Sequence, residues 1–571
     1  MSLKMKFVQI GKIGLLFGTI LLVFTCAHKV APTGGPPDKT PPQVLRSFPA
    51  PDSVNVGQIE FIEIEFSEAI QKTSLLRNYW IVPEIENGFR IKWKGNRRVR
   101  FYFKSNLEPD QTYLFSLGTN IKDLHRNALT DPFQLAFSTG ASLDSASISG
   151  GVFAEQAPKN VYIYAYPGSG GAWQDSLLRE RARYYTQIGK DGFFRFIRLP
   201  LGNYRVFALQ DKDFDRTYSV GSDGIGIPFM DVHLDSVHPD FANLNFYLIE
   251  EDTLPPQIRS AKAVTCRRVD IRFTEPLRFS RTLQVQIQDS SGTKTILPRA
   301  ISFDESKGDV LTVLCDSLPA EQSFLITVRT ISDLAGNFPA DSALTGKFVG
   351  VAGKDTMSAK ITGFHPASGT SNVPYDSDIR VSANVPLDTA EFQKSFVLRS
   401  GENDTTVGKF DFRNLFQPVF KPDTLLKKNT TYTIELHLDS LGTVFAEPFP
   451  DTVLQSQFTT YDWADLGEIS GVVRVPDSTW RQAIIFARSL RGDHRYQTVS
   501  ETGREYLLKY LPAGKYLLHA VIDRNRNQRW DKGQTVEWQF AEPFLFRPDT
   551  VQVRRRWTRQ GIDFRFNFQG K

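Results

Sequence analysis

Residues 62–68 read IEIEFSE, and this stretch decides the predicted fold together with its counterpart further along the chain. Apolar and acidic residues alternate along it, which is the period-two pattern of a β-strand with one buried face. The pattern returns as VDIRFTE at residues 269–275. A Pro-Pro-Gln segment precedes each copy, and an Asp-Leu-x-x-Asn turn follows each copy. The sequence therefore predicts a repeated β-rich module.

The repeats of this first module type cover about 41–140, 254–350 and 357–460, and the third copy has lost its Asp-Leu-x-x-Asn turn. Each repeat consists of short alternating strands separated by Gly, Pro, Asn and Asp, which is typical of an Ig-like sandwich. Asp333 can bond its own backbone in the turn. Glu68 and Glu275 have no evident partner in the sequence, so we expect solvent-facing or turn-capping carboxylates. The Phe-Ser/Thr-Glu element and the turn resemble the SbsA-type bacterial Ig-like domain, more clearly in the first two copies than in the third.

A second module type is marked by LPLGNY at 199–204 and LPAGKY at 511–516, each preceded by an Ile-Ser-Gly strand. These segments resemble the transthyretin-like or carboxypeptidase-regulatory-like sandwich. The resemblance implies a tight reversal between two core strands, with the tyrosine (Tyr204 or Tyr516) planted in the core.

The N-terminus predicts export and a lipid anchor. Lys4, Lys6 and Lys12 flank an apolar run at 13–24 that is too short to span a bilayer, which is typical of a signal peptide. The segment VFTC at 23–26 resembles a lipobox, although Thr25 departs from the usual small residue. The resemblance implies cleavage before Cys26 and acylation of that cysteine, for example by palmitate. The alternative is an ordinary secretory signal with an incidental cysteine.

The order of these parts resembles a family of Gram-negative Ig-like-domain lipoproteins. The expected fold class is all-β, with tandem β-sandwich modules after a cleaved lipoprotein signal peptide. The expected organisation is a signal peptide at 1–25, a tether at 26–40, Ig-like modules at 41–142, 253–353 and 354–463 (the last degenerate), and transthyretin-like modules at 143–252 and 464–571. The expected location is the outer membrane, with the periplasmic face favoured over the cell surface, because no acidic cluster follows Cys26.

Composition and motifs favour a binding or structural role over catalysis. The net charge is +5 on 571 residues with dispersed Lys and Arg, so a nucleic-acid partner is not expected. No His-Glu-x-x-His pair, Gly-x-Ser-x-Gly elbow, Walker loop or dinucleotide fingerprint occurs in the sequence. We expect a non-enzymatic scaffold or adhesion module that contacts the membrane through its lipid and binds envelope proteins or glycans. The alternative is an envelope enzyme or processing factor with a cleft between modules.

Calcium is the one cofactor that the sequence suggests. Oxygen-bearing side chains recur at alternate positions seven residues beyond Tyr204 and Tyr516, and calcium takes six to eight oxygen ligands. The candidate ligands are Asp211, Asp213 and Asp215 in the first loop, and Asp523, Asn525, Asn527 and Asp531 in the second. The alternative is an Asx-rich turn whose side chains cap their own backbone.

The remaining cysteines, Cys266 and Cys315, both lie in the second Ig-like copy. An oxidising envelope allows them to form a disulfide, and two buried thiols are the alternative.

Overall fold

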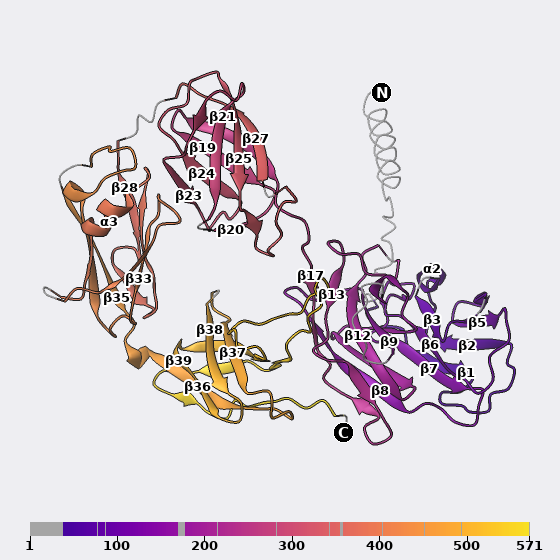
Figure 1. The fold of residues 1–571 in the computed structure, drawn as a ribbon. Coiled ribbons are helices and arrows are strands. Elements are labelled where there is room, and N and C mark those ends of the chain that lie inside the picture. Colours follow the sequence, from indigo (N-terminus) through magenta and orange to yellow (C-terminus); the bar gives the residue numbers. More distant parts are fainter. Residues whose placement is uncertain are drawn as a thin grey trace, which may run out of the picture.

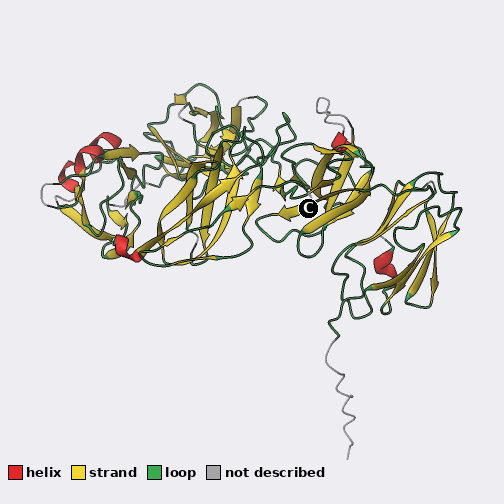
Figure 2. Cartoon of the chain, turned by 90° about the horizontal axis from the view of Figure 1, so that it is seen from below, coloured by secondary structure: helices red, strands yellow, loops and turns green. Residues whose placement is uncertain are grey.

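The computed structural model describes residues 38–569 except 77, 86, 169–176, 214, 281, 342, 354–357, 402–403, 450–451 and 493. This part of the chain is nearly all β, as predicted, with only short helical turns between the strands (Figure 2). None of its helices is long and apolar enough to cross a membrane. The predicted signal peptide and Cys26 lie outside the described residues.

Every sheet falls within one of five stretches of the chain, which we call modules 1 to 5: residues 41–142, 143–252, 253–353, 354–463 and 464–571. Their arrangement is visible in Figure 1, where the colour runs from indigo in module 1 to yellow in module 5.

Module 1 packs two sheets around a phenylalanine-rich core. The strand orders are β1-β2-β5-β4 and β3-β6-β7. Ile62, Ile64 and Phe66 of β2 point into the core, while Glu63 faces outward and accepts a hydrogen bond from Arg100 of β5. The alternation seen in the sequence is thus the alternation of the two faces. The elements are β1 Val44–Phe48, β2 Phe61–Phe66, α2 Lys72–Leu75, β3 Tyr79–Val82, β4 Phe89–Lys94, β5 Arg98–Phe103, β6 Thr112–Leu117 and β7 Phe133–Ser138.

Modules 3 and 4 have the same two-sheet plan. The strand orders are β18-β19-β24-β23 and β22-β21-β25-β27 in module 3, and β28-β30-β33-β32 and β29-β35-β34-β31 in module 4. Module 3 contains β18 Ile258–Thr265, β19 Arg268–Phe273, β20 Leu277–Arg278, β21 Gln284–Asp289, β22 Thr295–Ile296, β23 Ala300–Phe303, β24 Val310–Leu314, β25 Ser323–Arg329, β26 Ser332–Asp333 and β27 Ala343–Val349. Module 4 contains β28 Ile361–His365, β29 Thr370–Val373, β30 Ile379–Ala383, α3 Thr389–Ser395, β31 Phe396–Arg399, β32 Gly408–Asp411, β33 Val419–Pro422, β34 Thr431–His437, η2 Leu438–Ser440 and β35 Val453–Thr460.

Modules 2 and 5 share a second plan, in which the strand after the Leu-Pro-x-Gly-x-Tyr turn lies at the centre of the larger sheet. The orders are β10-β9-β12-β13-β17 in module 2 and β38-β37-β40-β41 in module 5. Tyr204 and Tyr516 are buried as expected, and their hydroxyls donate to the carbonyls of Pro200 and Pro512 at 2.8 and 2.7 Å. Each tyrosine therefore fastens the turn that precedes it.

The element bounds of these two modules are as follows. Module 2 contains β8 Ala146–Phe153, β9 Val161–Pro167, η1 Leu177–Arg179, β10 Tyr184–Gln187, β11 Phe193–Leu199, β12 Gly202–Gln210, β13 Gly224–Gly226, β14 Val232–Leu234, β15 Asp240–Phe241, β16 Phe246–Tyr247 and β17 Ile249–Glu250. The turn η3 Trp463–Asp465 spans the boundary between modules 4 and 5. Module 5 contains β36 Leu466–Arg474, β37 Gln482–Ser489, β38 Arg495–Glu501, β39 Glu505–Pro512, β40 Gly514–Ile522, β41 Phe544–Phe546, β42 Val551–Val553, β43 Thr558–Arg559 and β44 Phe564–Arg565.

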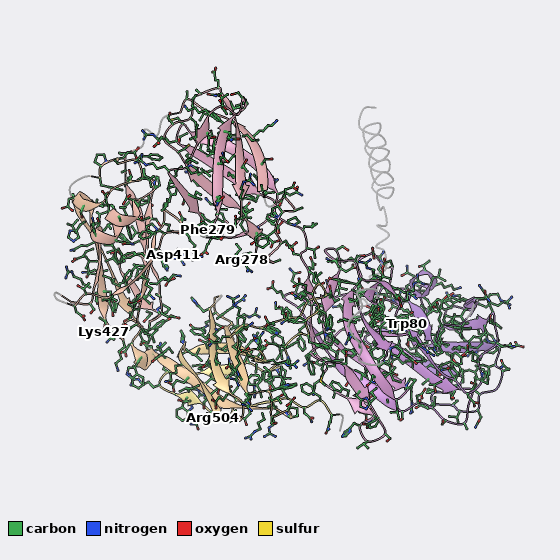
Figure 3. All side chains as sticks on the ribbon, in the orientation of Figure 1. Trp80, Arg278, Phe279, Asp411, Lys427 and Arg504 are labelled. Carbon is green, nitrogen blue, oxygen red and sulfur yellow. The ribbon has the colours of Figure 1, made fainter. Side chains whose placement is uncertain are left out.

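Neighbouring modules are in direct contact. Trp80 of module 1, labelled in Figure 3, lies beside module 2. Its ring stacks on Tyr185 of module 2 at 5.3 Å between ring centroids, and its Nε1 donates to the Tyr185 carbonyl. Phe303 of module 3 donates its backbone N–H to the carbonyl of Arg413 in module 4 at 2.7 Å. The ring of Tyr375 in module 4 meets the ring of Tyr510 in module 5 edge to face.

The chain path closes on itself, because module 5 returns to module 2 and shares a hydrophobic core with it (Figure 1). Phe229 of module 2 contacts Phe568 of module 5 at 4.7 Å between ring centroids. Ala242 N–H donates to the Phe568 carbonyl, so the C-terminal segment continues the edge of a module 2 sheet. Modules 2, 3, 4 and 5 therefore form a ring, and module 1 is attached to it outside.

Buried polar contacts also join the closing pair of modules. Glu251 accepts hydrogen bonds from the backbone N–H and the hydroxyl of Thr535, and both residues are buried. Asn245 donates from Nδ2 to the Phe544 carbonyl. At Gly533 the two modules approach closely, since a Cβ there would lie 2.7 Å from Ile227. We call this contact between modules 2 and 5 the closure interface.

Candidate functional site

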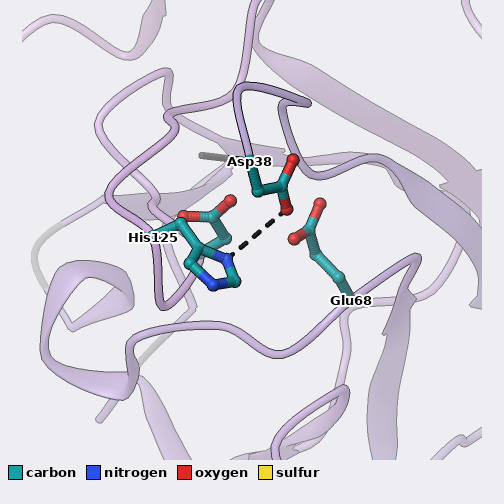
Figure 4. A group of neighbouring side chains, drawn as sticks. Asp38, Glu68 and His125 are labelled. Carbon is teal, nitrogen blue, oxygen red and sulfur yellow. Dashed lines mark ion pairs between the residues drawn. The ribbon is translucent and has the colours of Figure 1, made fainter. Parts of the chain in front are cut away.

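The clearest gathering of charged side chains in the described residues lies at the entrance to module 1. Glu68 follows β2, Asp123 begins the turn after β6, and Asp38 precedes the first strand. Figure 4 shows Asp38, Glu68 and His125 gathered there. Ligand atoms of these three carboxylates and of His125 all lie within 4.8 Å of one another. Nδ1 of His125 is 3.4 Å from a carboxylate oxygen of Asp38.

Asn127 fixes the geometry of this cluster. Its backbone N–H and its Nδ2 donate to the two carboxylate oxygens of Asp123, both at 2.8 Å. The same Nδ2 donates to the carbonyl of Asp38 at 3.1 Å. The Asp-Leu-x-x-Asn turn thus ties the segment that enters the module to the module itself.

Module 3 repeats the three carboxylates and the asparagine of this arrangement. Asp252, Glu275 and Asp333 lie within 4.8 Å of one another, and Asn337 donates to Asp333 and to the Asp252 carbonyl at 2.8 and 2.9 Å. The position of His125 is taken by Ala335.

Burial and mutual repulsion raise the pKa of the central glutamate in both clusters. The pKa of Glu68 is raised by burial first, and then by the charges of Asp123 and Asp38, while His125 acts in the opposite direction. The pKa of Glu275 is raised to about 7, first by burial and then by hydrogen bonds and repulsion from Asp252 and Asp333. Near neutral pH the Glu275 carboxyl is therefore poised to hold a proton.

Module 4 folds without this cluster. Asn384 corresponds to Ser67 and Thr274, because all three side chains accept a hydrogen bond from the backbone that enters the module. Val385, the next residue, therefore stands where the other two modules have a glutamate. Thr443 takes the place of the turn aspartate, and its hydroxyl accepts from the N–H of Glu447. The fold therefore does not require the three carboxylates.

The structure corrects one expectation for this cluster. Glu68 and Glu275 were expected to be solvent-facing or turn-capping carboxylates, but each is half-buried and faces two aspartates. One of these aspartates comes from a turn about 55 residues away, so no local motif contains the pair. The repetition of Phe-Ser/Thr-Glu together with Asp-Leu-x-x-Asn in the same two copies was the signal that could have linked them. Such a group can share a proton or bind a cation through its oxygens.

The first predicted calcium loop does bring its carboxylates together. Asp211, Asp213 and Asp215 offer oxygens within 4.8 Å of one another. Asp211 is buried and accepts from the N–H of Arg216, while Asp215 accepts from the N–H and hydroxyl of Thr217. The carboxylates thus converge, as a calcium site requires, and they also cap their own backbone, as an Asx turn does. Calcium binding at this loop stays a prediction.

The second predicted loop is capped more completely by its own side chains. Asp523 accepts from the N–H groups of Asn527 and Gln528, and the amides of Asn525 and Asn527 both donate to Asp531. With two amide groups directed at Asp531, the loop satisfies its carboxylates internally. Cation binding there would require both amides to turn.

The other predicted residues are placed as follows. Cys266 and Cys315 are free thiols, Cys315 being buried and Cys266 half-buried. Burial raises the pKa of the Cys315 thiol to about 11. The predicted lipidation site, Cys26, lies outside the described residues.

A sequence model of the bacterial Ig-like domain matches residues 38–139 and 355–460, which are modules 1 and 4. These modules are similar to bacterial Ig-like domains. The sequence motifs had favoured the first and second copies, whereas the match falls on the first and third. Modules 1 and 4 are each followed by a module of the second plan, so the order of sheet plans repeats a two-module unit with module 3 between its copies. No curated protein matches the chain.

Several solved structures align with the chain at low similarity. The N-terminal part of the bacterial S-layer protein SbsC is 14% identical, with a TM-score of 0.16, over 37% of this chain and 45% of that one. An L,D-transpeptidase from Mycobacterium smegmatis is 14% identical, with a TM-score of 0.15, over 28% and 60%. An I-band fragment from titin is 9% identical, with a TM-score of 0.12, over 47% and 94%. The chain thus spans less than two thirds of the first two, and at these TM-scores the likenesses carry no argument about function.

Proposed function

We propose that this chain is a non-catalytic scaffold of the bacterial envelope, held on the periplasmic face of the outer membrane by a lipid on Cys26. Its modules 2 and 5 would be of the transthyretin-like type, and its partners would be envelope proteins or glycans. The observation that carries the proposal is the closure interface, which fixes the relative positions of modules far apart in the sequence.

A closed frame suits a scaffold for a physical reason. Modules joined only by linkers move relative to one another, and a partner that contacts several of them must then pay the entropy of ordering them. The buried pair Glu251 and Thr535 and the contact of Phe229 with Phe568 remove that freedom before binding. A partner that contacts two modules would therefore bind a preformed surface.

Pull-down from envelope fractions tests this proposal. The full mature chain is expected to retain a discrete set of envelope proteins, and a variant with an opened closure interface, Asn245→Asp, is expected to lose part of that set. Asp563→Asn, at the equivalent position of module 5 but away from the interface, is the matched control and should behave as wild type. Equal retention by the wild type and the opened variant, or turnover of a model substrate by the purified chain, would contradict the scaffold.

A further inference from the structure

A cleft of about 470 Å³ lies where module 4 meets module 5. Four tyrosines line it: Tyr375 and Tyr461 from module 4, and Tyr496 and Tyr510 from module 5. Its volume is within the ~300–1,000 Å³ typical of small-molecule sites. The polar lining comes from both sides of the cleft and includes Asp376, Arg495, Gln497, Thr498 and Lys509.

Contacts among the tyrosines hold them in place. Tyr375 is buried, and its hydroxyl donates to the carbonyl of Tyr461 at 2.9 Å. The ring of Tyr510 meets that of Tyr375 edge to face at 5.2 Å, while 45% of Tyr510 remains exposed. Tyr496 rests edge to face on the core residue Tyr516 at 6.0 Å. The cleft therefore presents ordered aromatic surface to solvent without the entropy cost of fixing mobile side chains.

The equivalent junction between modules 1 and 2 shows that three of these tyrosines are not required by the fold. Tyr510 lies in a bulge of β39 with φ +62°, and Arg198 occupies the matching bulge of β11 with φ +58°. A left-handed backbone conformation is unusual for a bulky residue, yet it occurs at this position in both modules. The fold of the module therefore imposes the conformation, whether the side chain is Tyr or Arg. Arg198 forms an ion pair with Asp52 of module 1.

The other two replacements follow from matched backbone contacts. Thr139 and Thr460 accept equivalent hydrogen bonds from Gln111 and Thr430, and the residue after each threonine is Gly140 in one junction and Tyr461 in the other. Asn55 and Asn372 are equivalent residues with a left-handed backbone. Tyr375 comes three residues after Asn372, and the residue three positions after Asn55 is Gln58. Only Tyr496 has a tyrosine counterpart, Tyr184, since both pair with an alanine of the preceding strand.

From this cleft we infer that the module 4–5 junction binds an oligosaccharide of acetamido sugars. The inference rests on the proposed binding function and names its ligand class. Sugar rings carry apolar C–H faces that pack on aromatic faces, and their hydroxyls suit the amide of Gln497 and the cations of Arg495 and Lys509. Leu425, 55% exposed at the same cleft, offers an apolar contact for an acetamido methyl group.

Calorimetric titration of the full mature chain with tetra-N-acetylchitotetraose tests this inference. Binding is expected, and cellotetraose, with the same linkage but hydroxyls in place of acetamido groups, should bind about tenfold more weakly because it lacks the methyl contacts. Tyr510→Arg and Tyr461→Gly should each weaken binding by about tenfold or more. Tyr510→Arg installs the residue that the module 1–2 junction carries at a matching φ, and Tyr461→Gly installs the residue that follows the equivalent threonine there, so the fold is expected to be kept. Arg198→Ala at that other junction is the matched control and should bind as wild type.

Each remaining outcome would overturn the inference. No heat of binding for the chitotetraose at millimolar concentration would do so, and so would equal affinity for cellotetraose. Grooves lined by tyrosine also receive proline-rich peptides, so a peptide of sequence APTGGPPDKTPP, copied from residues 31–42, is titrated as well. If that peptide binds in a Tyr510-dependent way and the sugar does not, the ligand class is a peptide. The cleft is separate from the closure interface, so a failure here leaves the pull-down test of the scaffold unaffected.

Discussion

The carboxylate of Glu251 accepts hydrogen bonds from both the backbone N–H and the hydroxyl of Thr535, a residue 284 positions further along the chain. The hydroxyl of Tyr218 donates to the same carboxylate at 2.6 Å. The three donors satisfy a carboxylate that is only 9% exposed, and they come from both modules of the closure interface. This residue therefore joins the last strand of module 2 to a loop of module 5.

Glu251→Ala is expected to weaken the closure interface, because it leaves the donors of Thr535 and Tyr218 without an acceptor in a buried place. Each unsatisfied buried group costs about 1–3 kcal/mol. Small-angle X-ray scattering should show a larger maximum dimension, and limited proteolysis should become faster near residue 535. Glu250→Gln is the control, since Glu250 is exposed and pairs with Lys212 at the surface. An unchanged scattering profile for Glu251→Ala would show that other contacts suffice.

Asn245→Asp is expected to open the same interface by a different route. Oδ1 of Asn245 accepts from the N–H of Gly151, and its Nδ2 donates to the Phe544 carbonyl across the interface. A carboxylate keeps the first contact and turns the second into repulsion between two oxygens. Asp563 occupies the equivalent position in module 5 and accepts from the N–H of Val472. Asp563→Asn should therefore be tolerated, and equal scattering profiles for the two variants would contradict this assignment.

Glu275 is expected to make module 3 less stable as the pH rises. Its pKa is about 7 in the folded chain against an ordinary value of 4.5, so the folded state holds a proton that the unfolded state has lost. Stability is then greatest below about pH 4.5 and falls as the pH rises through 7. Glu275→Gln cannot ionise and should raise the melting temperature relative to wild type at pH 8, with little effect at pH 4.5. Calorimetry of the full chain at both values checks this, and a variant effect independent of pH would refute it.

Calcium is expected to raise the melting temperature of the full chain, and a chelator should reverse the rise, because a ligand of the native state stabilises it. The loop with three convergent carboxylates should account for most of the effect, so Asp213→Asn with Asp215→Asn should reduce it. The matched change in the second loop, Asp531→Asn, should have a smaller effect, since its carboxylate already accepts two amide hydrogen bonds. If saturating calcium leaves the melting curve unchanged, both loops are only turns.

Cys26→Ser is expected to release the chain from the membrane fraction or to stall its maturation, because several acyl chains supply the anchoring free energy. Fractionation followed by immunoblotting measures the distribution, and mass spectrometry of the wild type should find a mature N-terminus at Cys26. Cys266→Ser is the control, since that thiol lies in module 3. Membrane retention and processing that are unchanged in Cys26→Ser would contradict the anchor.

The sequence by itself determined the strands and the repeats. Alternation along residues 62–68 placed Ile62, Ile64 and Phe66 in the core, and the Leu-Pro-x-Gly-x-Tyr segments located Tyr204 and Tyr516. These features are local, because the faces of a strand and the residues of a tight turn are set by neighbours in the sequence. The Asx capping in both predicted calcium loops belongs to the same class.

Only the tertiary structure decided which distant residues meet. Glu275 and Asp333 lie on separate turns of one module, and Glu251 and Thr535 lie on modules separated by two others. The tyrosine cleft likewise depends on how module 5 is set against module 4. The period of a strand fixes which face a side chain occupies, but it carries no information on the angle between one sandwich and the next. That angle is set by packing across the junctions, where the contacting residues are scattered along the whole chain.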